Sequence, residues 1–125
     1  MISLLFSQQS VGAENWITIA ETKESKWAVK KGTFEFSTNK MGEPVWVVIG
    51  RTKNRKSLKV DLYKWYVTEF DCGRELGKVV SLDISGVFLF DNDFVFGGET
   101  IATSMAETIC GIGKYTLNKE NEKGL

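Results

Sequence analysis

Histidine is absent from this sequence of 125 residues. Histidine is the usual general base near neutral pH and the commonest metal-ligating side chain. Its absence excludes Ser-His and Cys-His nucleophilic sites, together with most zinc sites. Catalysis would then depend on carboxylates, lysine or tyrosine, and the carboxylates show no recognisable clustering along the chain. We therefore expect a protein that is not an enzyme and that holds no cofactor or metal.

Proline, net charge and long apolar runs are also scarce. There is one proline, and the chain shows no repeat or low-complexity tract. Sixteen basic residues balance sixteen acidic residues, whereas a nucleic-acid-binding surface needs a basic footprint. No apolar run reaches the roughly 18 residues that cross a bilayer. A chain of this length has room for one core, so we expect one domain with no membrane span and no nucleic-acid partner.

The chain has two cysteines, Cys72 and Cys110, and neither belongs to a Cys-x-x-Cys pair. This spacing does not indicate a redox or zinc motif. Two interpretations remain, namely two separate buried thiols or a disulfide, which requires an oxidising compartment. A disulfide would close a loop of about 39 residues and contribute about 4 kcal/mol in the chain-entropy description.

Residues 1–13 have features of the end of a signal peptide. Residues 2–6 are apolar, and residues 11–13 (Val-Gly-Ala) place small side chains where a signal peptidase reads them. We expect cleavage before Glu14, which predicts an exported bacterial protein that is periplasmic, at the cell surface or secreted. The charged start is missing, so we interpret residues 1–13 as a remnant, the alternative being a first strand or a frayed terminus.

Most of the chain is predicted to be β-structure. Runs rich in β-branched and aromatic residues, separated by glycines and turn signals, predict strands. Asn39–Pro44 is expected to be a turn, and so is Asp91–Asp93, because Val95 stands where a calcium loop needs an oxygen ligand. The predicted strands cover residues 16–20, 26–30, 34–36, 45–49, 63–72, 79–84, 87–90 and 94–96.

Residues 100–110 lose the aromatic side chains and predict a helix. We expect Thr103 or Ser104 to cap its start. Glu107, three residues after Ser104, would complete a capping box, and Gly111 or Gly113 would end the helix. One face of this helix carries Ile101, Met105, Thr108 and Ile109.

The order of these segments and the placement of the cysteines resemble the surface-adhesin protein E-like family of bacterial envelope proteins. The sequence departs from the family at residues 27–30, where a Tyr-Tyr-Ile-Asp-like strand is usual, and at residues 97–100, where Pro-x-Ser is common. The stretches that correspond are Trp16–Ala20, Val45–Trp46, Lys64–Cys72, Ser81–Phe90 and Ala106–Cys110.

The resemblance implies an α+β, mainly β fold, with an antiparallel sheet of about six strands and one C-terminal helix. A disulfide between Cys72 and Cys110 would tie this helix to the sheet. We expect the domain to span residues 14–117, followed by a flexible tail at 118–125. Because the family's named member is an adhesin for host matrix and plasma proteins, the resemblance implies a non-catalytic cell-envelope binding module. The alternative is a small secreted or periplasmic inhibitor of an enzyme such as lysozyme.

A basic segment, residues 51–59, joins two predicted strands. Such a segment is suited to bind glycosaminoglycan, acidic protein or lipid headgroups, and the alternative is a solvated hairpin connection. Its five basic residues are Arg51, Lys53, Arg55, Lys56 and Lys59.

Tyr63 and Trp65 are the predicted interface residues. Side chains alternate along a strand, and counting back from Cys72 places both rings on the face away from the helix. Because a single sheet leaves that face uncovered, we expect Tyr63 and Trp65 to contact a protein or acidic polysaccharide partner, or a second copy in a homodimer. The alternative is a sheet curled enough to cover the face itself.

Overall fold

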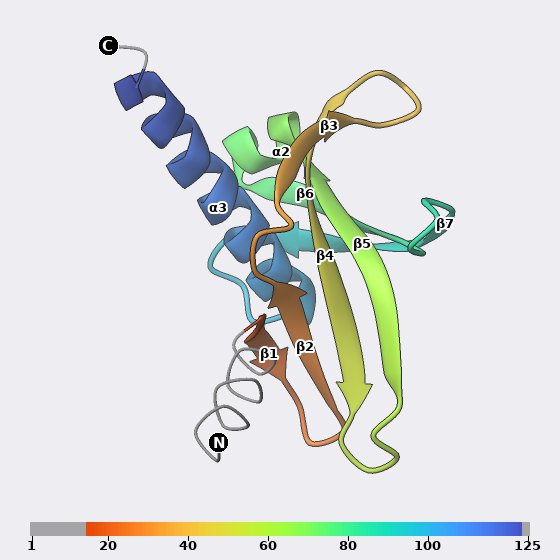
Figure 1. The fold of residues 1–125 in the computed structure, drawn as a ribbon. Coiled ribbons are helices and arrows are strands. Elements are labelled where there is room, and N and C mark those ends of the chain that lie inside the picture. Colours follow the sequence, from red (N-terminus) through yellow and green to blue (C-terminus); the bar gives the residue numbers. More distant parts are fainter. Residues whose placement is uncertain (1–14, 124–125) are drawn as a thin grey trace, which may run out of the picture.

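An antiparallel sheet carries one long helix on one face in the computed structural model, which describes residues 15–123 (Figure 1). The predicted α+β, mainly β class is confirmed, with seven strands in place of about six. The expected signal remnant at residues 1–13 and its cleavage site before Glu14 lie outside the described residues. The elements are β1 (Trp16–Glu21), β2 (Ser25–Lys30), β3 (Glu35–Thr38), β4 (Pro44–Asn54), β5 (Val60–Thr68), α2 (Glu69–Arg74), β6 (Leu76–Leu82), β7 (Phe88–Val95) and α3 (Ile101–Lys123).

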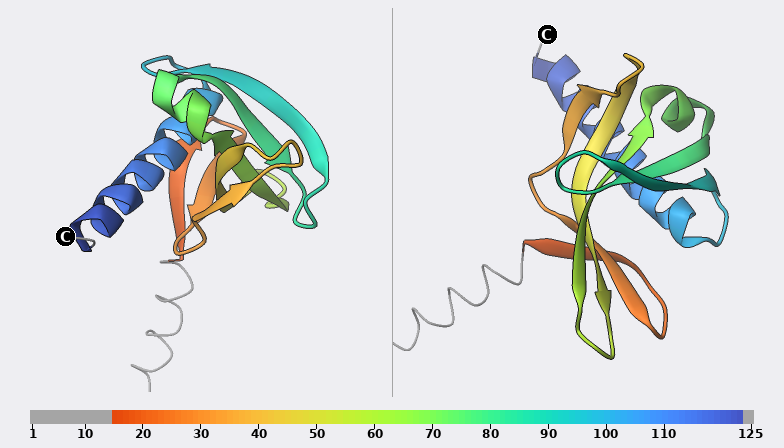
Figure 2. Two further views of the ribbon diagram at one scale, coloured as in Figure 1. Left: turned by 90° about the horizontal axis from the view of Figure 1, so that it is seen from above. Right: turned by 90° about the vertical axis from the view of Figure 1, so that its right-hand side faces the viewer.

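The long strand β4 organises the sheet, whose strand order is β1-β2-β4-β5-β6-β7. Along one edge, β4 pairs with β3 through residues 44–47 and with β2 through residues 50–54. Along the other edge it pairs with β5 over residues 45–53. The sheet twists strongly, so that β6 and β7 run across the direction of β4 and β5 (Figure 1). Figure 2 shows from two further sides that α3 lies along one face of this sheet.

The core lies between α3 and the sheet. Strand alternation points Trp46 and Val48 of β4, with Trp65 of β5, toward the helix. From the helix, Met105 and Ile109 are buried in the same cluster. Each large apolar side chain removed from water in this way contributes about 1.5–3 kcal/mol, so this layer supplies most of the packing energy.

The start of α3 differs from the prediction. Thr100, not Thr103 or Ser104, caps the helix, because the Thr103 amide donates a hydrogen bond to Thr100 Oγ1 at 3.1 Å. Glu107 does not complete a capping box, since its carboxylate accepts a hydrogen bond from the Gly97 amide at 2.9 Å. The predicted cap is therefore wrong by one turn, and the Gly97–Thr100 connection is tied to the helix instead.

The predicted stop of this helix at Gly111 or Gly113 is also wrong, because α3 continues to Lys123. Gly113 is buried, and a Cβ atom there would collide with the indole ring of Trp46. The glycine therefore serves close packing of the helix on the sheet and does not end the helix. As a result, residues 118–123 of the predicted flexible tail are helical.

The predicted strand at residues 63–72 ends at Thr68, where α2 begins. Thr68 caps α2, since its hydroxyl oxygen accepts a hydrogen bond from the Asp71 amide at 3.0 Å. Cys72 consequently lies in a short helix and not at the end of a strand. Side chains do not alternate between two faces in a helix. Counting back from Cys72 therefore does not show on which face of the sheet the side chains of β5 lie.

The turn predicted at Asp91–Asp93 is wrong, since these residues lie inside β7. The neighbouring strand supplies the reason, because Lys78 pairs with Asp93 in register. Its ammonium lies 2.8 Å from the Asp93 carboxylate and 3.6 Å from that of Asp91. The hydrogen bond to Asp93 and the two negative charges raise the pKa of Lys78, and the lysine offsets the repulsion between two carboxylates on one strand face.

Candidate functional site

The disulfide joins Cys72 of α2 to Cys110 of α3, with the two Cα atoms 5.5 Å apart. The predicted pairing is confirmed, and both side chains are fully buried. Because Cys72 belongs to α2, the bond ties one helix to another at the end of β5, within the core between helix and sheet. It is a structural bond that holds α3 in place through α2, which follows directly on β5.

Trp65 is not an interface residue. Only 1% of its surface is exposed, and it is buried on the face that α3 covers. The predicted contact of Trp65 with a partner or with a second copy is therefore wrong. Tyr63 shares this face and stacks on Trp65 with ring centroids 5.8 Å apart, but it is only half-buried. The sheet does not cover the Trp65 face by curling; the helix covers it.

The five predicted basic residues are spread over the β4–β5 hairpin. Arg51 and Lys53 belong to β4, Arg55 and Lys56 to the turn, and Lys59 precedes β5. Arg51 places its guanidinium 4.3 Å from the centroid of the Trp16 ring. Arg55 contacts the β1–β2 turn, where it donates a hydrogen bond to the Thr22 carbonyl at 2.9 Å and lies 3.6 Å from the Glu21 carboxylate.

These contacts divide the basic residues into two groups. Arg51 and Arg55 are held by neighbouring strands and turns, so part of their role is structural. Lys53, Lys56 and Lys59 form no ion pair among residues 15–121. Lys56 and Lys59 are exposed. The three lysines are the members of the segment that remain available to an anion.

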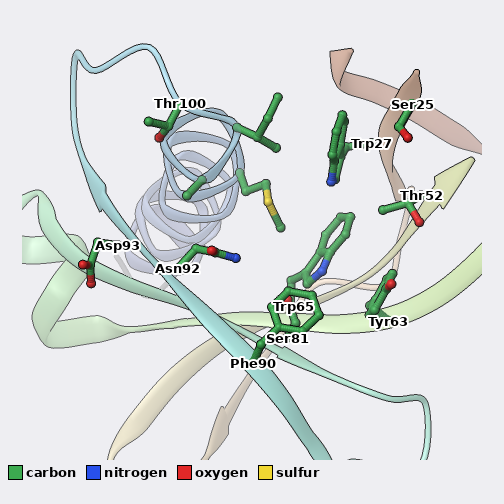
Figure 3. A pocket seen from close by; sticks show the side chains of 13 residues that line it. Ser25, Trp27, Thr52, Tyr63, Trp65, Ser81, Phe90, Asn92, Asp93 and Thr100 are labelled. Atoms are coloured by element: carbon green, nitrogen blue, oxygen red, sulfur yellow. The ribbon is translucent and has the colours of Figure 1, made fainter. Parts of the chain in front are cut away.

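An open cleft of about 560 Å³ lies on the helix-covered face, beside the start of α3 (Figure 3). Its volume falls within the roughly 300–1,000 Å³ of ligand sites. Because α3 begins at Ile101 and runs away from the end of the sheet that carries the β1–β2 turn, it leaves the lower part of the sheet face uncovered (Figure 1). Small side chains between the large ones leave the space that forms the cleft. The small residues at the cleft are Ser25, Thr52, Ser81, Thr100 and Ala102.

Aromatic rings form one side of the cleft. Figure 3 shows Trp27, Tyr63 and Phe90 around the buried Trp65, with Asn92 across from them. Tyr63 and Phe90 meet edge to face with centroids 6.2 Å apart. Trp27 and Tyr63 are half-buried and Phe90 is 46% exposed, so ring surface remains open to a ligand. The cleft therefore offers aromatic faces together with hydroxyl and carboxamide groups.

Of the residues at the cleft, Tyr63 and Trp65 are the two that the sequence predicts as interface residues. Trp27 alternates with Val29 along β2, which indicates a shared face but not which face it is. Asn92 belongs to the predicted turn at residues 91–93, and its position in β7 is what directs it to the cleft.

Among residues 15–123, no group of three His, Cys, Asp or Glu side chains is arranged to hold a metal ion. None of the helices in this range is long and apolar enough to cross a membrane.

The β6–β7 hairpin is a second exposed feature, and it projects away from the sheet (Figure 1). Asp83 holds its turn, because Asp83 Oδ1 accepts hydrogen bonds from the Ser85 hydroxyl at 2.6 Å and from the Val87 amide at 2.9 Å. These hydrogen bonds lower the pKa of Asp83. The turn therefore presents an apolar tip in a defined conformation. The apolar residues of the hairpin, each 44–57% exposed, are Ile84, Val87, Phe88, Leu89 and Phe90.

Comparison with known proteins adds no relative to this description. No protein-family model, no curated protein and no solved structure matches the chain. The aromatic cleft, the two exposed hairpins and the disulfide are therefore the features from which a function is inferred.

Proposed function

We propose that this protein is a non-catalytic binding module of the bacterial cell envelope, and that its ligand occupies the aromatic cleft. The observation that carries the proposal is the open ring surface of Trp27, Tyr63 and Phe90 around a cleft of about 560 Å³. Large apolar rings with a few polar groups are typical of ligand sites. Export is supported by the disulfide, since such bonds persist in oxidising compartments. The resemblance to the surface-adhesin protein E-like family favours the same class of function.

The ligand group that fits this cleft best is a sugar ring of a polysaccharide. A sugar ring has an apolar face that can lie on an aromatic side chain, and it has hydroxyl groups around its edge. Here the rings of Trp27 and Tyr63 supply the apolar surface. Thr52 and Asn92 supply donors and acceptors at the rim. An aromatic side chain of a partner protein is the competing occupant, and the same experiment separates the two.

Replacing Trp27 with alanine should weaken ligand binding at least about fivefold, because truncating a central aromatic contact costs more than about 1 kcal/mol. The parent chain would first be screened on a glycan array and against proteins from envelope and host extracts. The Trp27→Ala chain would then be titrated calorimetrically with each ligand found. Asn92→Ala provides a second variant at an exposed position, where folding is not in question.

The matched control is Tyr115→Ala, which removes an aromatic ring that is 63% exposed on α3, away from the cleft. Its affinity should equal that of the parent chain. If folded Trp27→Ala and Asn92→Ala chains both bind with unchanged affinity, the cleft is not the binding site. Binding to proteins but to no glycan would replace the sugar ring with a protein side chain.

The second candidate function is inhibition of a secreted enzyme such as lysozyme, and the projecting β6–β7 hairpin favours it. An inhibitor needs a protruding segment that enters an active-site cleft. Val87 and Phe88 are each 57% exposed; Val87 ends the turn and Phe88 begins β7. In this case Val87→Asp should abolish inhibition of cell-wall lysis by lysozyme, whereas Tyr115→Ala should retain it. A parent chain that inhibits none of a panel of lysozymes refutes this candidate.

A further inference from the structure

The end of the molecule formed by the β1–β2 turn and the β4–β5 hairpin carries an excess of positive charge. Residues 21–26 and 53–61 contain six basic and three acidic residues, although the chain as a whole is neutral. Both turns lie at one end of the sheet, opposite α2 and the C-terminus (Figure 1). Positive charge concentrated at one end of a neutral protein gives that end a local attraction for anions.

Arg55 joins the two turns into one surface. Its amide donates a hydrogen bond to the Glu24 carbonyl at 2.8 Å, and its guanidinium donates one to the Thr22 carbonyl at 2.9 Å. The same guanidinium lies 3.6 Å from Glu21, which is thereby partly neutralised. The remaining acidic residues at this end are Glu24 and Asp61. The backbones of the two turns are therefore held together, and both turns carry lysines.

Lys26 of β2 and Lys53 of β4 are direct cross-strand partners. Like charges in this position repel each other, and neither lysine forms an ion pair within residues 15–121. Lys56 and Lys59 continue the positive charge around the hairpin tip, also without ion pairs. An anionic surface that contacts this end would relieve the repulsion between Lys26 and Lys53.

Aliphatic side chains are exposed among these lysines. Leu58, at the tip, is 62% exposed, and Val60 and Leu62 on β5 are 41% and 48% exposed. Leu58 has a φ of 63°, in the left-handed region where glycine or asparagine is usual. Hydrogen bonds hold the turn, because the side chain of Asn54 accepts from the Lys56 and Ser57 amides at 2.9 Å. A bulky apolar side chain is thus held in solvent at an unfavourable backbone position.

We infer that this hairpin end, defined by Lys26, Lys53, Lys56, Leu58 and Lys59, contacts an anionic phospholipid surface. Apolar side chains that enter the headgroup region, flanked by lysines that attract the headgroups, are the combination that binds such surfaces. A polyanionic polysaccharide would account for the lysines but not for the exposed Leu58, Val60 and Leu62. The surface contact is separate from the cleft and does not depend on the ligand proposed for it.

The test is sedimentation of the full chain with phosphatidylcholine vesicles, with or without phosphatidylglycerol. The parent should sediment only with vesicles that contain phosphatidylglycerol, and binding should weaken as salt rises. The triple variant Lys53→Gln, Lys56→Gln, Lys59→Gln should bind about 100-fold more weakly, at about fivefold for each lysine. A control, Lys114→Gln with Lys119→Gln, removes two positive charges from α3 and should change little.

Leu58→Asn tests the apolar contact separately. Asparagine suits the left-handed backbone, so the chain should fold as well as the parent, which circular dichroism would check. We expect its affinity for phosphatidylglycerol vesicles to fall several-fold. Unchanged affinity of this variant, or equal binding of the parent to both vesicle types, would overturn the inference. Binding to heparin without binding to either vesicle would also overturn it, in favour of an acidic polysaccharide.

Discussion

Replacing both cysteines, as Cys72→Ala with Cys110→Ala, should lower the free energy of unfolding by about 4 kcal/mol. The bond joins residues 38 positions apart, and its loss increases the conformational freedom of the unfolded chain. For a domain whose total stability is about 5–15 kcal/mol, this is a large share. Both side chains are fully buried, and alanine leaves no polar group in their place.

Equilibrium unfolding in urea measures this effect. The midpoint should fall, and the dependence on urea should steepen, because the unfolded chain becomes less compact without the bond. The parent chain treated with a reductant should match the double variant. An unchanged midpoint would mean that the bond contributes no stability. Free thiols at Cys72 and Cys110 in periplasmic material, found by non-reducing peptide mapping, would show that the bond does not form there.

Trp65→Ala should cost about 3–5 kcal/mol, a large part of a total stability of about 5–15 kcal/mol. The indole ring is 1% exposed and belongs to the cluster between β4, β5 and α3. It also lies over Gly50, where a Cβ atom would collide with the ring. Because Gly50 has no side chain, it cannot fill the cavity that alanine leaves at position 65.

Thermal unfolding followed by circular dichroism would measure the effect, with Phe70→Ala as the control. Phe70 is 71% exposed, so its variant should stay within about 0.5 kcal/mol of the parent. A Trp65→Ala chain that keeps the stability of the parent would contradict the assignment of this residue to the core. It would also restore Trp65 as a candidate for contact with a partner or a second copy, which its burial excludes.

The sequence by itself determined where most strands lie, because strand patterns are local. The continuous apolar run at residues 45–49 predicted the central strand, and β4 contains it. The start of α2 also had a local signal, since Thr68 followed by Asp71 matches a capping pattern. The aromatic residues before Thr68 favour a continuing strand and outweigh this signal in the sequence pattern. The predicted strand therefore runs on to Cys72, which lies in α2.

The tertiary structure decided the length of α3, because Gly113, one of the two glycines predicted to end the helix, packs against a partner that is distant in the sequence. Gly113 faces the Trp46 indole, and a helix seated that closely requires a residue without a side chain at the contact. In the same way, Asp91 and Asp93 lie in β7 because this strand pairs with β6, which also places Lys78 beside both carboxylates. Local propensity favours a turn there, and cross-strand pairing prevails.

Which face of the sheet is buried, and where that face is left open, also came only from the tertiary structure. Alternation along β5 groups Tyr63 with Trp65, but it does not say on which side α3 lies. The helix covers Trp65 and leaves Tyr63 at the edge of the cleft, beside Trp27 of β2 and Phe90 of β7. These rings are far apart in the sequence and meet because strand pairing and the starting point of α3 bring them together, and neither is encoded in any local pattern.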